Sequence, residues 1–489
     1  MKQHPESAPI VIVGAGVSGI ATAIRLRELG IEDFVILERA SGPGGTWHNY
    51  RYPGLSCDIP SHLYCFSFEQ KSDWTRTHAG QEEIREYLAH CVDKYGIGPH
   101  IRYDVEVVGA RWDDAARQWC LDLADGQRLH AGVFVSAIGM FNEIQRPDIE
   151  GLDDFGGQTL HSARWPDHVD LRGKRVAVIG TAASAVQMIP ELAKQAARLL
   201  VYQRTANWVF PKEDRMFSTG ELERFRQDPQ AGLKLRQELH DFFELFLPFD
   251  NADLMQMVAD KARANLDNVV DPVLRAKMLP NVPVCSQRPL FSDDYYPTFN
   301  RPNVELVTAG IERITAAGIR TDDGMERPID VLVLATGYAA NKFLSVIEVC
   351  GRDGLRLADA WREGAQAYLG MTTSGFPNLF MLYGPNTNNG SIIYMLEQQA
   401  AYIANKIAWM REHDIEWIDV RREAMDRYNE ELQRDLDAVE VWRTPATRYY
   451  RAASGRIVTQ WPHNMGAYQA RTRKPDLEAF EIAPANAVA

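Results

Sequence analysis

The sequence predicts an α/β protein with two dinucleotide-binding, Rossmann-like domains, and three observations support that fold class. Two segments have the pattern strand, glycine turn, helix and strand, beginning near Ile10 and Val176. A charged residue stands the same number of positions after the first glycine of each turn. Within the second unit, residues 212–283 lack strand patterns bounded by glycines, and their apolar residues recur at the spacing typical of helices.

Composition and charge are those of an ordinary globular protein. The chain has 489 residues, 45% of them hydrophobic, with 53 Lys and Arg against 66 Asp and Glu for a net charge of -13. That balance argues against long disorder and against a broad basic surface for nucleic acid or anionic membranes. We therefore expect no nucleic-acid partner, while the oligomeric state stays open.

The cysteines and the apolar runs exclude further classes. Six cysteines are scattered without a C-x-x-C pair, which disfavours a redox dithiol, a zinc site and a disulfide scaffold. We therefore predict no metal site. No uninterrupted apolar run of about 18 residues occurs, so we expect no membrane span and a cytoplasmic location.

The first unit places three glycines directly after a β-branched strand. Gly14, Gly16 and Gly19 have the G-x-G-x-x-G spacing, which permits a tight turn, close approach of a pyrophosphate and close packing of helix on strand. The following helix N-terminus offers amide donors to phosphates. Glu38, 24 residues after Gly14, ends the second strand, where its carboxylate can accept hydrogen bonds from ribose hydroxyls. The unit suits FAD.

The second unit repeats the design with a basic residue. Its turn contains Gly180, Ala182 and Ala185, and its second strand ends at Arg204, again 24 residues after the first glycine. A guanidinium can pair with a 2'-phosphate, which a carboxylate would repel, so this unit suits NADPH. Ala182 weakens the interpretation, because its methyl group stands where the phosphate backbone comes closest. The alternative is a structural βαβ unit with a solvated Arg204.

These features predict a division of the chain into three stretches. Residues 1–150 form the first part of a discontinuous FAD-binding domain. Residues 151–337 form an NADP-binding domain with a helical insertion at about 212–283. Residues 338–489 form the second part of the FAD-binding domain and the C-terminal region, where another helix N-terminus near residues 389–391 can hold a polar ring edge.

Two nucleotide domains in one chain predict a flavin-dependent oxidoreductase, because hydride donor and flavin must meet between them. A disulfide reductase would need a C-x-x-C or C-x4-C dithiol, and the sequence has none. Two reactions of the reduced flavin are left: delivery of electrons to molecular oxygen, or to an external acceptor.

One segment resembles a family fingerprint. FGGQTLHSARWPD, residues 155–167, is similar to the F-x-G-x-x-x-H-x-x-x-W-P/D motif of type I Baeyer-Villiger monooxygenases, which are class B flavin-dependent monooxygenases. It lies between the two glycine turns, as that family requires. Also similar, in family order, are GGTW (44–47), RYPGLSCD (51–58), QRTANW (203–208), ATGY (335–338) and GPNTN (384–388). Related N- and S-oxidising enzymes usually carry Tyr or Phe where Trp165 stands.

The resemblance implies a reaction and a catalytic pair. NADPH would reduce FAD, oxygen would add to give a C4a-peroxyflavin, and that peroxide would attack a ketone to give an ester or lactone. The family's active-site arginine falls on Arg288, and its carboxylate partner falls on Asp58. An always-charged guanidinium can stabilise a peroxide anion, and a carboxylate beside it can orient the guanidinium.

The resemblance also implies that the fingerprint residues act in a hinge and in cofactor coupling rather than in proton transfer; these are Phe155, Gly157, His161, Trp165 and Pro166. Turn geometry and resemblance together assign the cofactor contacts to Gly14, Gly16, Gly19, Glu38, Gly45, Thr46, Trp47, Asp58, Tyr64, Val107, Gly180, Thr181, Ala182, Ser184, Ala185, Gln187, Arg204, Thr205, Gln287 and Arg288.

Departures from the family keep alternatives open. Many relatives carry a lysine beside the arginine, but this chain has Gln287, so a weaker preference for NADPH over NADH is expected. An N- or S-oxygenating flavin monooxygenase is the alternative enzyme. A flavoprotein that binds both nucleotides as a redox sensor or partner module, without oxygenating anything, is the alternative from another class.

Overall fold

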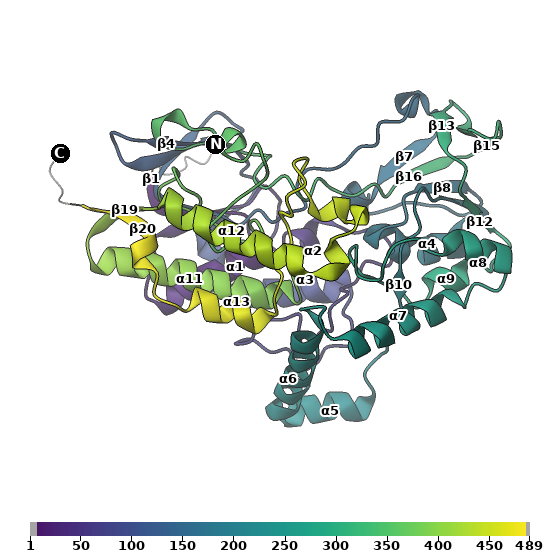
Figure 1. Cartoon of the computed structure of the whole chain (residues 1–489), viewed down its shortest axis with the longest axis horizontal. Coiled ribbons are helices and arrows are strands. Elements are labelled where there is room, and N and C mark those ends of the chain that lie inside the picture. The colour runs from purple at the N-terminus through teal and green to yellow at the C-terminus, as the bar shows by residue number, and fades with distance from the viewer. Residues whose placement is uncertain (1–6, 486–489) are drawn as a thin grey trace.

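The computed structural model describes residues 7–485 and shows two α/β units side by side, joined by a central region (Figure 1). The first unit is built on an eight-stranded sheet in the order β17-β4-β5-β6-β1-β2-β3, with β18 paired to β6. Its strands are β1 (Ser7–Val13), β2 (Phe34–Leu37), β3 (Ile101–Arg102), β4 (Val107–Asp113), β5 (Gln118–Leu123), β6 (Arg128–Ser136), β17 (Glu348–Cys350) and β18 (Leu379–Met381).

Strand β1 is the centre of that sheet. It pairs in parallel with β2 and β6, so that Ile12 lies opposite Ile36 and Val135, and all three side chains are fully buried. Because both faces of the strand are covered, its buried residues form a continuous apolar run in the sequence. The helices of this unit are α1 (Val17–Glu28), α2 (Thr46–Asn49), α3 (Gln81–Lys94), α10 (Leu357–Ala360), α11 (Ile392–Glu412), α12 (Arg422–Ala438) and α13 (Met465–Thr472).

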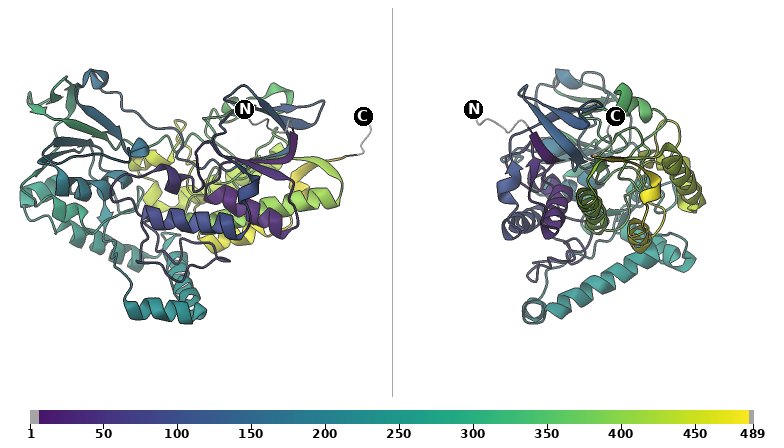
Figure 2. Two further views of the ribbon diagram at one scale, coloured as in Figure 1. Left: turned by 180° about the vertical axis from the view of Figure 1, so that it is seen from behind. Right: turned by 90° about the vertical axis from the view of Figure 1, so that its left-hand side faces the viewer.

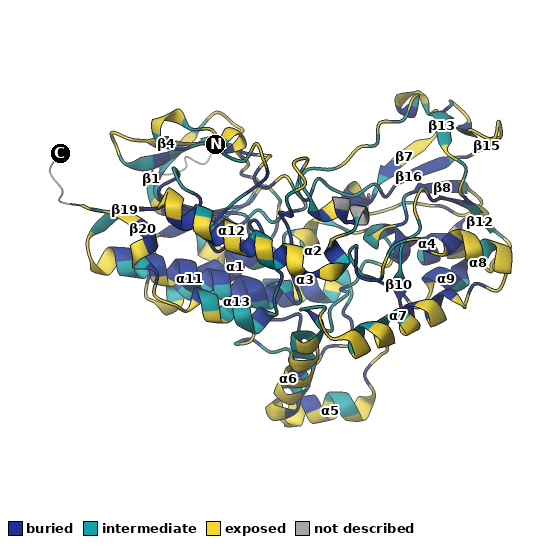
Figure 3. Cartoon of the chain, in the orientation of Figure 1, coloured by how far each residue is buried: buried dark blue, intermediate teal, exposed yellow. Residues whose placement is uncertain are grey.

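Helices α1 and α11 pack against each other under the first sheet, although they are far apart in sequence. A small antiparallel pair, β19 (Ile415–Val420) with β20 (Phe480–Pro484), closes the end of this unit. Figure 3 shows the buried residues gathered in the sheets and along α11.

The second unit contains a five-stranded parallel sheet in the order β12-β9-β8-β16-β7 and a three-stranded antiparallel sheet, β13-β14-β15. Helix α4 (Ala183–Gln195) follows β8 and packs against α9 (Tyr295–Thr298). The strands are β7 (Gln158–His161), β8 (Arg175–Ile179), β9 (Arg198–Tyr202), β12 (Val304–Val307), β13 (Ile311–Ile314), β14 (Gly318–Thr321), β15 (Glu326–Pro328) and β16 (Val331–Leu334), with the separate parallel pair β10 (Val209–Phe210) and β11 (Leu290–Phe291).

The chain crosses between the units twice, after β6 and after β16, and the two crossings are hydrogen-bonded to each other. The amide of Gln145 donates to the carbonyl oxygen of Gly337 at 2.9 Å. The amide of Ala339 donates to the carbonyl oxygen of Glu143 at 3.0 Å. Strands β17 and β18 then lie back in the first sheet. The domain boundaries expected after residues 150 and 337 stay predictions, and residues 1–6 and 486–489 of the outer stretches lie outside the described ones.

Helices α5 to α8 follow β10. Helices α5 and α6 project from the body of the molecule, whereas Leu266 of α7 and Met278 of α8 lie in the core of the second unit (Figures 1 and 2). Their bounds are α5 (Thr219–Gln227), α6 (Pro229–Phe246), α7 (Ala252–Leu266) and α8 (Pro272–Met278). Within residues 7–485, no helix is long and apolar enough to cross a membrane.

Helix α6 is attached to the first unit by a buried arginine. Arg236 is 8% exposed, and its Nη1 donates to the carbonyl oxygens of His62 at 3.0 Å and Cys65 at 2.9 Å. Near the C-terminal end of α6, Glu244 accepts from the amides of Met465 and Gly466, at the N-terminus of α13. A helix that lies between strands of the second unit in sequence therefore contacts the first.

We expect Arg236→Met to destabilise the protein, because methionine keeps the apolar stem but leaves buried carbonyl oxygens without a donor, at a cost of roughly 1–3 kcal/mol. The thermal unfolding midpoint should fall by several degrees. Arg224→Met, on the exposed face of α5, is the matched control and should leave the midpoint unchanged. Equal midpoints for both variants would show that Arg236 does not hold α6 in place.

Candidate active site

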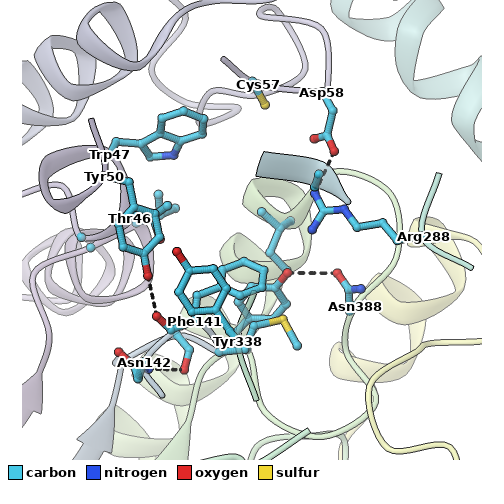
Figure 4. A pocket seen from close by; sticks show the side chains of 18 of the residues that line it. Thr46, Trp47, Tyr50, Cys57, Asp58, Phe141, Asn142, Arg288, Tyr338 and Asn388 are labelled. Atoms are coloured by element: carbon cyan, nitrogen blue, oxygen red, sulfur yellow. Dashed lines mark hydrogen bonds and ion pairs between the residues drawn. The ribbon is translucent and has the colours of Figure 1, made fainter. Parts of the chain in front are cut away.

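A cavity of about 560 Å³ is lined by residues from both units. From the first unit come the glycine turn after β1, the segment around α2 and the loop around Asp58. From the second come the start of α4 and the segment before β11, and both crossings also contribute. Figure 4 shows Trp47, Asp58 and Arg288 around this cavity.

The first glycine turn is too tight for side chains. Gly14 has φ +108°, and a Cβ on it would lie 2.6 Å from the carbonyl oxygen of Ala137. A Cβ on Gly19 would lie 1.9 Å from the carbonyl oxygen of Gly14. Gly16 faces Gly45, where an added Cβ would come within 2.9 Å of the Gly16 Cα. The turn is thus a bare backbone cradle at the start of α1, and it fits a pyrophosphate.

Glu38 is held beside that cradle. Its two carboxylate oxygens accept from the amides of Ala15 at 2.7 Å and Ala40 at 2.8 Å, and the side chain is 5% exposed. A carboxylate oxygen can accept more than one hydrogen bond, so the group can still receive ribose hydroxyls. The cradle and this fixed carboxylate together fit the nucleotide half of FAD.

An aromatic pair forms another part of the wall. Trp47, in α2, donates from Nε1 to the Tyr64 hydroxyl at 3.1 Å, and the two rings meet edge-on at 5.6 Å. Both side chains are buried and both line the cavity, as do Thr46 and Val107. These predicted cofactor contacts therefore all line the same cavity.

The second glycine turn has the same backbone geometry as the first. Gly180 has φ +115°, and a Cβ on it would lie 2.4 Å from the carbonyl oxygen of Ala335. Ala182 is the N-cap of α4, and no side chain caps the amides at this helix end. Residues 182–184 line the cavity. Arg204 follows β9, is exposed, and makes no ion pair with any carboxylate within residues 7–485. The arrangement fits a phosphate-bearing nucleotide.

The structure separates the predicted site residues into two groups. Those that line the cavity are Gly14, Gly16, Glu38, Gly45, Thr46, Trp47, Asp58, Tyr64, Val107, Ala182, Ser184, Gln187, Gln287 and Arg288. Those outside its lining are Gly19, Gly180, Thr181, Ala185, Arg204, Thr205, Phe155, Gly157, His161, Trp165 and Pro166.

The fingerprint histidine lies at the crossings rather than in the cavity. His161 ends β7, and its Nε2 is 3.4 Å from the Thr336 hydroxyl, which donates to the carbonyl of Gln145 at 2.6 Å. Burial lowers the pKa of His161, so the ring is neutral near pH 7. Asp167, at the end of the fingerprint, pairs with Arg51 of the first unit at 2.8 Å. The hinge role stays a prediction, and this position is compatible with it.

Gln187 lines the cavity and also forms hydrogen bonds with other residues of the protein. Its Nε2 donates to the carbonyl of Ser56 at 2.9 Å, and its Oε1 accepts from the Tyr52 hydroxyl at 2.9 Å. Both partners belong to the first unit, whereas Gln187 lies on α4 of the second. The side chain that we predicted as a cofactor contact thus also joins the two units.

Arg288 and Asp58, 230 positions apart, meet in the cavity with Nη2 and Oδ2 2.8 Å apart (Figure 4). Burial alone would raise the pKa of Asp58, but Arg288, and after it Lys212, lower it below the ordinary value. Asp58 in turn raises the pKa of Arg288 despite burial. Both groups are therefore charged at neutral pH, and the guanidinium is a permanent cation whose direction is set by the carboxylate.

Several cavity residues were not assigned from the sequence. Tyr50 donates to the carbonyl of Phe141 at 2.6 Å and stacks on Tyr338, with ring centroids 5.5 Å apart. Asn388 accepts from the Tyr383 hydroxyl at 3.0 Å. The ATGY and GPNTN segments contain Tyr338 and Asn388, so the resemblance marked them without assigning a role. No signal in the sequence marks the stacking partner of Tyr338.

The described residues bring together no set of metal ligands. Within residues 7–485, no group of three or more His, Cys, Asp or Glu side chains could hold a metal ion. The six cysteines are all free thiols, and burial raises the pKa of Cys57, which lies beside Asp58 in the cavity wall.

Residues 11–226 match the model of the pyridine nucleotide-disulphide oxidoreductase family, and this stretch spans both glycine turns. The match indicates an oxidoreductase with paired nucleotide-binding folds.

Relatives with named activities narrow this class. A Baeyer-Villiger monooxygenase of Pseudomonas aeruginosa is 40% identical over 97% of this chain and 91% of its own length. Another from Streptomyces coelicolor is 38% identical over 98% of this chain and 94% of its own. The chain belongs to the Baeyer-Villiger monooxygenase family.

Solved structures agree in fold. Cyclohexanone monooxygenase from Rhodococcus sp. Phi1 bound to NADP+ superposes with a TM-score of 0.88 at 29% identity, over 98% of this chain and all of that one. The OTEMO complex with FAD and NADP gives 0.86 at 29% identity, over 97% and 99% of the two chains. The predicted family and the predicted fold class with two nucleotide-binding domains are confirmed.

Proposed function

We propose that this chain is an FAD- and NADPH-dependent Baeyer-Villiger monooxygenase, which inserts one oxygen atom from O2 beside a ketone carbonyl to give an ester or lactone. The second oxygen atom leaves as water, and NADPH is oxidised to NADP+. The observation that carries the proposal is the Arg288–Asp58 pair at 2.8 Å in a cavity lined from both glycine-turn units. The relatives' names, and structures solved with FAD and NADP, support the choice of cofactors.

Each nucleotide is assigned to one unit. The cradle of Gly14, Gly16 and Gly45 with Glu38 holds FAD, in a domain made of residues 1–150 and 338–489. The turn at Gly180, with Arg204, holds NADPH in a domain of residues 151–337. When bound, the two cofactors supply the hydride transfer and the activation of oxygen that no side chain of this protein can perform.

The side chains supply electrostatics and exclusion of water. Arg288 is a cation that does not titrate, so it stabilises negative charge developing on oxygen without giving up a proton. Asp58 accepts from its guanidinium and fixes its direction. Aromatic groups around the cavity, including Trp47, Tyr50 and Tyr338, keep water from the reacting atoms.

The first test concerns FAD. Gly19→Ala should abolish or strongly reduce FAD content, because the added methyl would lie 1.9 Å from the Gly14 carbonyl oxygen and force the turn open. Gly220→Ala, in the first turn of α5 with no atom within 4 Å of the added methyl, is the control and should be as yellow as the parent. The flavin-to-protein absorbance ratio measures both. A yellow Gly19→Ala protein with full FAD content would contradict the assignment.

The second test concerns the nicotinamide cofactor. Arg204→Ala should raise the KM for NADPH by roughly 10-fold or more and leave NADH use nearly unchanged, since a charge-assisted phosphate contact contributes about 1.5–3 kcal/mol. Gln287→Lys should increase the preference for NADPH, because it adds a cation to the cavity wall. Steady-state kinetics with both cofactors decide this. Equal losses with NADPH and NADH would mean that Arg204 does not recognise the phosphate.

The third test concerns the oxygenation step. Arg288→Ala should bind FAD normally, form hydrogen peroxide in place of ester, and be reduced more slowly by NADPH. Asp58→Ala should show a milder form of the defect, because the cation remains but loses its orienting partner. Arg275→Ala, an arginine of α8 that pairs with Asp267 at the surface, is the control. Stopped-flow spectra with product quantification measure these effects, and ester formation by Arg288→Ala near the parental rate would refute the assignment.

A further inference from the structure

A lysine crosses from the second unit to the loop that carries Asp58. Lys212 stands two residues after β10, and its Nζ donates to the hydroxyl of Ser56 at 2.6 Å. Ser56 lies two residues before Asp58 in the segment between α2 and α3 of the first unit. Lys212 has no place in the function proposed above, on which the present inference rests.

The ammonium group of Lys212 has an unusual environment for a lysine. Within residues 7–485 no carboxylate lies within ion-pair distance of its Nζ, and Asp214, two positions away, pairs with Arg76 at 2.6 Å. Burial lowers the pKa of Lys212, and the nearby Asp214, Cys57 and Asp58 act against that shift. A partly buried ammonium bonded to a neutral hydroxyl carries a desolvation cost that no ion pair offsets. Stabilisation of the fold is therefore a poor account of its presence.

The other contacts of the Asp58 loop show what Lys212 adds. From the second unit, Gln187 donates to the Ser56 carbonyl and Arg288 pairs with Asp58. Gly54 lies against the main chain of α4, where a Cβ would come within 2.4 Å of the Gln187 carbonyl oxygen. The hydroxyl of Ser56 is a further polar group of this stretch that faces the second unit, and Lys212 is its donor.

The charge of Lys212 acts on the same carboxylate. After Arg288, Lys212 is the next positive group that lowers the pKa of Asp58. Arg288 can therefore hold Asp58 from one side while the lysine holds the loop two residues earlier. Loss of the ammonium removes both a mechanical contact and a positive charge near Asp58.

We propose that Lys212 is a positioning residue for oxygenation: by bonding to Ser56 across the two units, it holds Asp58 in place against Arg288. It touches neither substrate nor cofactor in this assignment. Its effect on the reaction passes through the direction in which Asp58 sets the Arg288 guanidinium.

The test uses the full chain with FAD bound and compares Lys212→Met, Lys212→Arg and Ser56→Ala. Lys261→Met is the matched control, since Lys261 lies on α7 of the same helical insertion and forms an exposed ion pair with Glu213 at 2.8 Å. Turnover is measured with the best ketone among cyclohexanone, acetophenone and 2-decanone, as kcat, KM and ester formed per NADPH consumed. Hydrogen–deuterium exchange of peptides covering residues 52–60 reports on the loop without any turnover.

Lys212→Met is expected to speed exchange in residues 52–60, lower kcat by roughly 10-fold and lower the ester formed per NADPH, with the ketone KM within about 3-fold of the parent. Lys212→Arg should restore most of the kcat, because it returns the donor and the charge. Ser56→Ala should show a smaller loss of the same kind, since the charge remains. Lys261→Met should match the parent in every measurement.

Parental kcat and parental exchange in Lys212→Met would overturn the proposal, and so would a loss of kcat that Lys212→Arg does not restore. If Lys212→Met fails to retain FAD, Ser56→Ala takes its place, and unchanged exchange and kcat in that variant would overturn the proposal equally. If the parent itself makes no ester from any ketone, the proposed function fails. The exchange measurement then still decides whether Lys212 holds the Asp58 loop.

Discussion

The ion pair between Arg288 and Asp58 exists only while the two units of the molecule keep one orientation. The partners lie 230 positions apart and come from different units, yet their atoms meet at 2.8 Å. The side chains of Arg288 and Asp58 are 39% and 28% exposed, and water screens a partly exposed ion pair, so the pair adds little to stability by itself. Its value is geometric, because it aims a permanent cation at one point of the cavity.

The rest of the interface maintains that orientation. The two crossings are hydrogen-bonded to each other at Gln145 and Gly337, and Gln187 donates to the loop that precedes Asp58. None of these contacts lies inside one unit. The candidate active site is therefore a property of the interface, and a change far from the cavity can alter it by shifting one unit against the other.

The helical insertion also contributes to the cavity through contacts with the first unit. Arg236 attaches α6 to the loop around His62, and the C-terminal end of α6 then brings Phe246 into the cavity wall. Phe249, just beyond α6, meets Trp442 of the C-terminal region edge-on at 5.5 Å. One wall of the site thus joins segments that lie far apart in the sequence.

The sequence by itself determined the two nucleotide-binding turns, because their requirements are local. Gly14 and Gly180 stand where φ is positive and the backbone contacts the residue just after another strand, so only glycine satisfies the turn, and the pattern could be recognised. The charged residue 24 positions later is equally local, because it lies just after the next strand of the same unit. The resemblance added the pair of Arg288 and Asp58, which no local pattern would have joined.

Tertiary structure alone decided the contacts across the interface. Lys212 and Ser56 are 156 positions apart, and nothing in the neighbours of either residue encodes their approach to 2.6 Å. Gln187 follows the second glycine turn as a cofactor contact would, yet its amide is directed at Ser56 by the way the units pack. Short-range patterns specify turns, strands and helix faces, because these depend on adjacent dihedral angles. Contacts between distant side chains depend on how finished units pack, which no short-range pattern contains.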